Sequence, residues 1–288
     1  MFTLTRINPF ALSFYFLVQI VIIMIFFNPI LVVIGLLTAI VLSIMSSGAK
    51  GIILYLLFFL VIAITNPIFS HNGMTPLFYV NSNAITLEAI IYGLIMGGVV
   101  LAVFYNIKNF NAYITPDKLI YIIGKFTPKI ALLISMVLNF VPMIVSKGKD
   151  IYSCQKLLVK NDKNIIKKLK LLITVVSCVI SQMLENGVIT SDSMSARGYG
   201  TVKRTSSIKR KFKRSDMLFV VVTLVLASVV FVAGANNVFY FYCYPKISTV
   251  KTDLFAIIAY SSFFILSIMP IIIFVIGELK WKYLISKI

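Results

Sequence analysis

The chain has 288 residues, of which 60% are hydrophobic and 12% are charged, and its formal net charge is +18. Soluble domains carry roughly 25% charged residues, so this composition excludes an ordinary soluble domain and predicts a polytopic membrane protein. Of its 27 Lys and Arg residues, 16 lie between Lys147 and Arg214, which places this segment in the cytoplasm by the positive-inside rule.

The first part of the chain consists of apolar runs of bilayer-crossing length. They are residues 10–27, 30–45, 52–69 and 84–107. Asn28 and Pro29 form the turn between the first two runs. The loop before the fourth run contains no Lys or Arg, as expected of an outer loop. We therefore predict an N-terminal membrane block of four spans, residues 1–108.

The middle of the chain, residues 109–215, is predicted to be a cytoplasmic or interfacial region. Pro128 to Val145 is apolar, but a crossing there would move the basic segment outside. We expect this piece and the one before it to lie along or dip into the inner face, with Pro142 bending or ending the second helix.

A long amphipathic helix is predicted next, because polar and apolar residues follow two separate lines at steps of three or four. The polar line is Lys163, Lys167, Lys170, Thr174, Ser177, Ser181 and Glu185, and the apolar line is Ile165, Leu169, Leu172, Val176, Val179 and Met183. The apolar line needs a neighbour, either the membrane surface or the preceding helix.

Gly198 and Gly200 are predicted to end this helix, which places Arg197 in or next to its last turn. Ala196 and Gly198 leave the backbone bare, so the guanidinium of Arg197 could reach a carboxylate of a partner with bidentate geometry. The simpler interpretation is a cationic helix cap followed by a solvated loop.

A C-terminal membrane block, residues 216–288, completes the predicted all-α bundle of about six spans. Its spans are residues 217–235 and 254–276. We therefore predict a multi-pass protein of the plasma membrane with both termini in the cytoplasm. The apolar runs lack the paired ionisable residues that an intramembrane enzyme needs. We therefore predict no catalytic residue, no metal ligand and no enzyme activity.

Five short motifs along the chain resemble the transmembrane T component of energy-coupling factor transporters, the group that includes the cobalt transport permease family. They are Asn83 to Gly93 (NAITLEAIIYG), Ile114 to Leu119 (ITPDKL), Asn139 to Pro142 (NFVP), Met194 to Gly200 (MSARGYG) and Lys203 to Thr205 (KRT).

The resemblance implies the energy-coupling subunit of an ABC-type importer for vitamins or cobalt and nickel ions. Its partners would be two cytoplasmic ATPases, a substrate-binding membrane S component and the lipid bilayer, with no nucleic acid. ATP would bind to the ATPases, so no cofactor is expected in this chain. Ala196, Arg197 and Gly198 would dock one ATPase, and long amphipathic coupling helices would transmit its movement.

A first docking motif departs from the family pattern. The matching residues are Cys154, Gln155, Lys156, Leu157, Leu158 and Val159. Leu158 stands where the family has an arginine, so either an apolar anchor replaces the ion pair, or Lys156 or Lys160 takes that role in a shifted register.

The apolar faces of the two long helices are predicted to pack together or to hold the S component. The residues concerned are Val137, Phe140, Val141, Val176 and Val179. An independent secondary transporter or channel is the alternative function, although the inverted repeats and polar midplane residues typical of such proteins are not evident.

Overall fold

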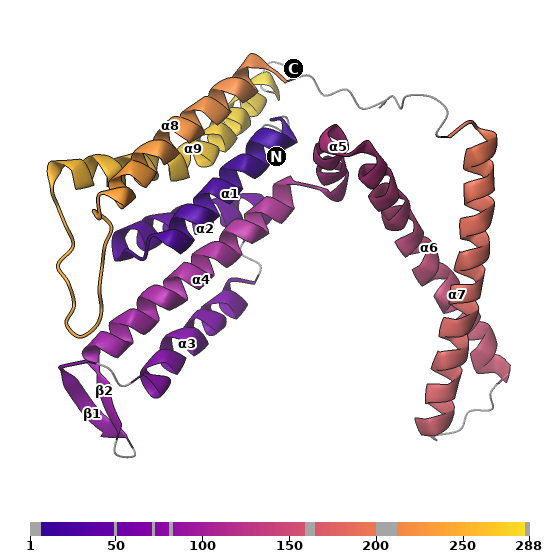
Figure 1. The fold of residues 1–288 in the computed structure, drawn as a ribbon, viewed down its shortest axis with the longest axis horizontal. Coiled ribbons are helices and arrows are strands. Elements are labelled where there is room, and N and C mark those ends of the chain that lie inside the picture. The colour runs from indigo at the N-terminus through magenta and orange to yellow at the C-terminus, as the bar shows by residue number, and fades with distance from the viewer. Residues whose placement is uncertain are drawn as a thin grey trace. The chain divides into compact units, whose positions relative to one another are not determined.

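The structure is a computed structural model that describes residues 7–48, 51–70, 73–80, 83–158, 165–199 and 212–285. Within these ranges the chain forms nine helices and one two-stranded hairpin (Figure 1). It divides into two compact units, residues 1–115 with 210–288, here called the bundle, and residues 116–209, here called the α5–α7 unit. The expected all-α fold class is confirmed by the helices of the described residues.

Two Asn-Pro pairs start the first helices of the bundle. Asn8 precedes α1 (Pro9–Ile25) and Asn28 precedes α2 (Pro29–Ser47), and each Asn side chain accepts a hydrogen bond from the backbone N–H two residues later. Proline at the first helical position costs no hydrogen bond, since that N–H has no partner inside a helix. Both helix starts can therefore be read directly from the sequence.

A β-hairpin fills the loop before the fourth predicted span. Strand β1 (Pro76–Val80) pairs antiparallel with β2 (Asn83–Thr86), between α3 (Ile52–Phe69) and α4 (Leu87–Tyr113). Glu88, in the first turn of α4, accepts hydrogen bonds from the hydroxyl of Thr75 at 2.8 Å and its N–H at 3.4 Å. The carboxylate thus ties the hairpin to the helix. The sequence predicted an outer loop up to Asn83 and the fourth span from residue 84, so β2 takes the first residues of that predicted span.

The core of the bundle lies around α1, which contacts α2, α4 and α8 (Arg214–Ala235). Tyr15 and Phe16 of α1 are buried, as are Phe219 of α8 and Phe263 of α9 (Leu254–Ile285). The rings of Tyr15 and Phe219 lie 5.8 Å apart. Helices α8 and α9 run side by side, as do α3 and α4 (Figure 1).

Polar side chains tie the bundle helices to one another. Gln19 of α1 donates to the hydroxyl of Ser267 of α9 at 3.4 Å, and the Asn28 amide donates to Tyr260 of the same helix at 3.1 Å. Asn109 of α4 donates to the carbonyl of Ala39 of α2 at 2.9 Å. The net contribution of one such hydrogen bond to stability is about 1 kcal/mol, so these bonds fix register more than they add stability.

The loop between α8 and α9 packs against the end of the bundle where α2 begins. Cys243 of this loop is buried against Val32 of α2 and Ile95 of α4. Burial raises the pKa of the Cys243 thiol. Because the thiolate is the reactive form, this cysteine should react slowly at neutral pH.

The α5–α7 unit consists of α5 (Pro116–Phe126), α6 (Pro128–Leu158) and α7 (Ile165–Ala196). Helix α6 contacts both α5 and α7, and it continues through Pro142. The expectation that Pro142 could end this helix is wrong, because a proline removes only one backbone hydrogen bond from a helix.

Six described helices are long and apolar enough to cross a membrane. They are α2, α4, α6, α7, α8 and α9, whereas α1 and α3 are apolar but shorter. The predicted six spans counted residues 10–27 and 52–69 and left out α6 and α7. The number of candidate spans therefore agrees with the prediction, but the helices are not the same ones. Helices α6 and α7 qualify because each contains a long apolar window, despite Pro142 in α6 and the polar line of α7.

Candidate functional site

Helix α7 ends in the way that its glycine predicts. Gly198 has a φ of +76°. The N–H of Tyr199 donates to the carbonyl of Met194 at 3.0 Å, and the N–H of Gly198 donates to that of Ser195 at 3.0 Å. These two bonds form a Schellman motif with Gly198 at the left-handed position. Arg197 is exposed directly before it, as predicted.

This helix end gives a paired test of backbone conformation. Gly198→Ala is expected to destabilise the end of α7 by about 1 kcal/mol, because a left-handed φ is unfavourable for alanine. Gly187→Ala should instead stabilise α7 by about 1 kcal/mol, since Gly187 lies inside the helix and an added Cβ would meet nothing within 4 Å. Hydrogen exchange of residues 190–199 measures both. Faster exchange in both variants would contradict this geometry.

Residues 154–158 of the expected first motif lie at the end of α6. Cys154, Lys156 and Leu157 are exposed, and Leu157 is 87% accessible. Gln155 is half-buried. The side chain of Leu158 and all of Val159 lie outside the described residues.

The contact between α6 and α7 includes Val179 of the predicted face and leaves Val176 outside it. A Cβ added to Gly148 of α6 would lie 3.8 Å from Val179, in ordinary van der Waals contact, so the two helices are close there. Val179 and Phe140 are half-buried. Val175 is buried, while the predicted Val176 is 54% exposed, as are Val137 (51%) and Val141 (48%).

Two amide side chains on the inner face of α7 were missed from the sequence. Within the described chain, Gln182 Oε1 and Asn186 Nδ2 are buried without a hydrogen-bond partner. They lie one turn apart, on the helix face that carries Val175 and Val179. The available signal was that Gln182 and Asn186 continue the line of Val175 and Val179 at steps of three or four. The predicted apolar line ran through Met183 instead, so the two amides were placed outside it.

Exposed lysines lie where α6 ends and α7 begins. Lys149 and Lys156 of α6 and Lys168 and Lys170 of α7 are exposed. The acidic residues of the two helices, Asp150, Glu185 and Asp192, are exposed as well, but Glu185 and Asp192 lie in the second half of α7. Positive charge therefore exceeds negative charge where α6 ends and α7 begins.

A comparison with protein families finds one that overlaps these helices. Residues 129–218 match the family described as 25S rRNA (adenine(2142)-N(1))-methyltransferase, Bmt2. The matched segment contains almost all of α6, all of α7 and the first turn of α8. It covers fewer than a third of the 288 residues. A search of curated proteins finds no match.

The described residues of the matched segment do not fit S-adenosylmethionine, the methyl donor of this family. A cofactor site is a concavity with converging polar groups. Here the described residues are almost entirely helical, and Gly148 and Gly187 lie inside helices, where backbone N–H groups are already bonded. Asp216 is occupied by the backbone N–H groups of Asn8 and Lys213. No step of a methyl transfer is therefore derived for this chain.

The family match corrects several predictions. It contradicts the resemblance to the energy-coupling T component and the function that this resemblance implied. The expected ATPase and S-component partners and the uptake of vitamins, cobalt or nickel are contradicted with it, and so is the alternative transporter function. It also contradicts the expected absence of enzyme activity, of a cofactor and of a nucleic-acid partner, because the family is named for a reaction on rRNA. Residues 129–218 of this chain are thus similar to the Bmt2 family.

Proposed function

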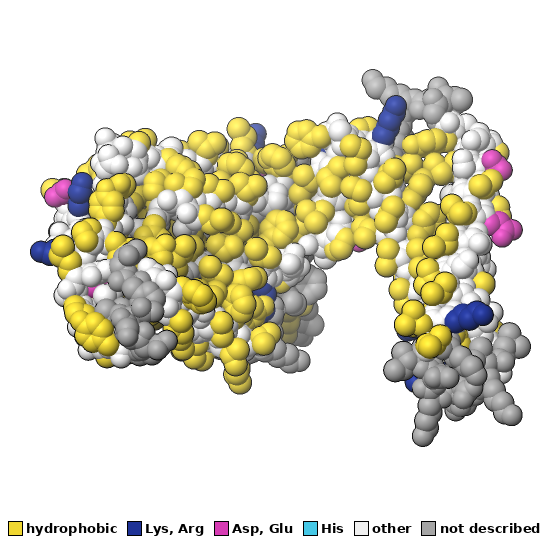
Figure 2. All heavy atoms as spheres, turned by 60° about the horizontal axis from the view of Figure 1, so that its bottom comes forward, with side chains coloured by type: hydrophobic (Ala, Val, Ile, Leu, Met, Phe, Trp, Pro, Cys, Tyr) yellow, Lys and Arg dark blue, Asp and Glu magenta, His cyan; other side chains and the backbone are white. Residues whose placement is uncertain are grey.

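We propose that this chain is a multi-pass membrane protein with its basic region and both termini in the cytoplasm. The observation that carries the proposal is the apolar exterior of the bundle. Hydrophobic side chains cover much of its visible face (Figure 2). Leu17, Leu57, Leu224 and Ile265 each expose more than half of their surface. An apolar exterior of this extent needs a bilayer around it.

The proposed topology has the domain limits 1–108, 109–215 and 216–288. Its six crossings are α1, α2, α3, α4, α8 and α9. If α6 and α7 also crossed, parity would be kept, but the loop between them would lie outside. That loop and its flanks carry Lys156, Lys160, Lys163, Lys167, Lys168 and Lys170. The positive-inside rule opposes this arrangement.

Cysteine labelling in intact cells tests the topology at one residue. Cys154 is exposed in the last turn of α6, so a chain that keeps it and carries Cys178→Ala and Cys243→Ala has one reactive thiol at the disputed end. A membrane-impermeant maleimide should label Cys154 only after permeabilisation. The matched control adds Tyr79→Cys and Cys154→Ala to that chain, which leaves a thiol on exposed β1 that should label from outside.

Labelling of Cys154 from outside would show that α6 crosses the membrane. Extraction of the whole protein by alkaline carbonate would refute membrane integration itself. The two outcomes are separate, because the first changes only the number of crossings.

RNA binding by the basic region is a second candidate, and the observation that favours it is the family match. The 16 Lys and Arg residues between Lys147 and Arg214 could neutralise phosphates, and the affinity would then fall steeply with salt. Binding of a labelled rRNA fragment to the purified full chain, measured over a salt series, tests this. Transfer of a labelled methyl group to the same RNA tests the reaction of the matched family separately.

Charge reversal identifies the RNA contact. Lys168→Glu combined with Lys170→Glu should weaken RNA binding several-fold and flatten its dependence on salt, because fewer counterions are released. Lys246→Glu combined with Lys251→Glu, in the loop between α8 and α9, is the control and should leave binding unchanged. An equal loss in both variants would indicate attraction by net charge alone.

A further inference from the structure

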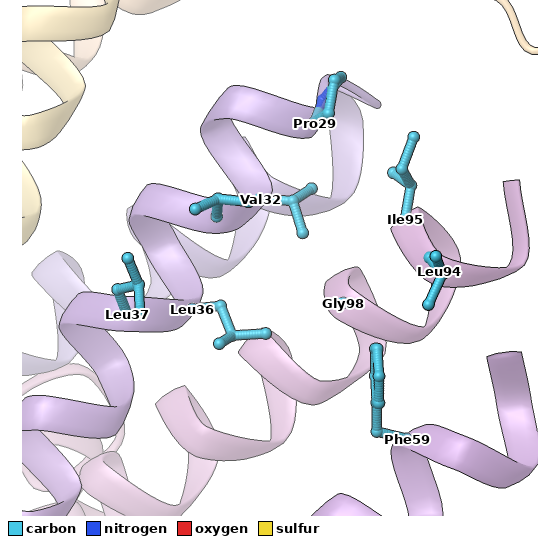
Figure 3. A pocket seen from close by; sticks show the side chains of 9 residues that line it. Pro29, Val32, Leu36, Leu37, Phe59, Leu94, Ile95 and Gly98 are labelled. Carbon is cyan, nitrogen blue, oxygen red and sulfur yellow. The ribbon is translucent and has the colours of Figure 1, made fainter. Parts of the chain in front are cut away.

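A groove lies within the bundle between α2, α3 and α4 (Figure 3). Its volume is about 250 Å³. The lining residues are Pro29, Val32, Val33, Leu36, Leu37, Phe59, Leu94, Ile95 and Gly98. None of these side chains can form a hydrogen bond, so the groove offers nothing to a polar ligand or to water.

Beside the groove, glycines of α4 let its neighbours approach closely. A Cβ at Gly98 would lie 2.8 Å from Cγ1 of Val32, and one at Gly97 would lie 3.0 Å from the ring of Phe59. Figure 3 shows Gly98 as the part of the wall without a side chain, with Val32 and Phe59 from the other two helices nearby. A larger residue at Gly98 would therefore clash with Val32.

One end of the groove meets a cluster that includes the loop between α8 and α9. Val32 and Ile95 line the groove and also pack with Cys243. The rings of Tyr92 and Tyr244 lie 5.4 Å apart in the same cluster, and the hydroxyl of Tyr244 is 3.3 Å from that of Ser70. An apolar groove with tyrosine and serine hydroxyls at one end suits a molecule with an apolar chain and a polar head.

The groove is continuous with the apolar exterior of the bundle. Val33, Leu37 and Leu94 line it and are themselves 55%, 57% and 46% exposed. In the proposed topology this exterior faces the lipid, and the end near Tyr244 lies at the outer interface. The molecules that surround the groove are therefore the acyl chains of the outer leaflet.

We propose that the groove binds one acyl chain of an outer-leaflet phospholipid, with the headgroup near Ser70 and Tyr244. This inference rests on the proposed membrane location. The chain lies along α2 and α4 and fills the space beside Gly98. Apolar cavities of comparable size stay dry and take apolar ligands, and a membrane supplies the acyl chain in excess.

Photo-crosslinking in lipid nanodiscs tests the groove. The probe is phosphatidylglycerol with a diazirine on one acyl chain, and crosslinked peptides are identified by mass spectrometry. We expect crosslinks to concentrate on the peptides that contain Val32 to Leu37 and Leu94 to Gly98. Leu94→Trp, which fills the groove from its rim, should reduce these crosslinks several-fold. Leu37→Trp is a second filling variant in case the first does not fold.

Leu57→Trp is the matched control, because Leu57 is 57% exposed on α3 and does not line the groove. It should leave the groove crosslinks unchanged. Crosslinks spread evenly over all exposed apolar helix faces would overturn the proposal, as would the absence of crosslinks on the groove peptides. If the protein does not enter nanodiscs at all, the membrane proposal fails first.

Discussion

Asp216→Ala is expected to lower the free energy of unfolding by about 3 kcal/mol, the sum of a lost helix cap and a stranded buried N–H. Asp216 is only 4% exposed. One of its oxygens accepts from the N–H of Asn8 at 3.2 Å and the other from the N–H of Lys213 at 3.1 Å. The carboxylate therefore joins the starts of α1 and α8. Unfolding in mixed micelles with rising SDS content measures the loss.

The control for this prediction is Asp192→Ala, because Asp192 is exposed on α7. A surface substitution of this kind changes stability by no more than about 0.5 kcal/mol. Asp216→Asn should fall between the two variants, since its amide keeps one accepting oxygen. Equal stability of Asp216→Ala and the unmodified protein would show that the buried N–H groups find other partners.

Gly93→Leu should separate α3 from α4 and lower the free energy of unfolding by about 3 kcal/mol, at the upper end of the cost of overpacking. A Cβ at Gly93 would lie 2.6 Å from the carbonyl oxygen of Ala63 and 3.2 Å from Cβ of Asn66. The clash is with the backbone, which cannot turn aside as a side chain can. It would also strain the bond from the Asn66 amide to the Ala89 carbonyl, now 2.9 Å.

Cysteine crosslinking between α3 and α4, together with the micelle unfolding assay, measures this effect. Gly187→Leu serves as the control, because nothing lies within 4 Å of an added Cβ there. We expect that variant to be at least as stable as the unmodified protein, because leucine favours a helix more than glycine does. A well-folded Gly93→Leu protein with intact α3–α4 crosslinks would show that the bundle can widen at this point.

Local signals in the sequence predicted the helix ends well. Asn28 with Pro29 gave the start of α2, and Gly198 gave the end of α7, because each depends on the conformation of one or two residues. The hairpin of β1 and β2 was not predicted, since its strands are short and lie beside a run that already indicated an outer loop.

The buried face of α7 could not be chosen from periodicity. Val175 and Val176 are adjacent and identical, so a stripe can run through either one. The structure buries Val175 because the contact with α6 passes through Val179 and Gly148. The groove beside Gly98 was hidden for a related reason, since it depends on how three consecutive helices pack against one another.

Function was predicted from short motifs, and the family comparison contradicts that prediction. The residues of the Ala196 to Gly198 motif do adopt the predicted helix end, yet such an end forms wherever glycine follows a helix. Local geometry of this kind identifies a conformation and leaves the partner open.

Within the described residues, one buried amide atom of Gln182 and one of Asn186 lack a hydrogen-bond partner, and this weakens the contact between α6 and α7. Each buried polar atom left without a partner costs about 1–3 kcal/mol, which offsets part of what the apolar contacts around Val175 and Val179 contribute. Rotation of α7 about its own axis would expose both amides to water and bury Val176 in their place. The helix pair is therefore closer in energy to a second arrangement than a wholly apolar contact would be, and a molecule that binds Val176 would favour the present arrangement, in which Val176 is exposed.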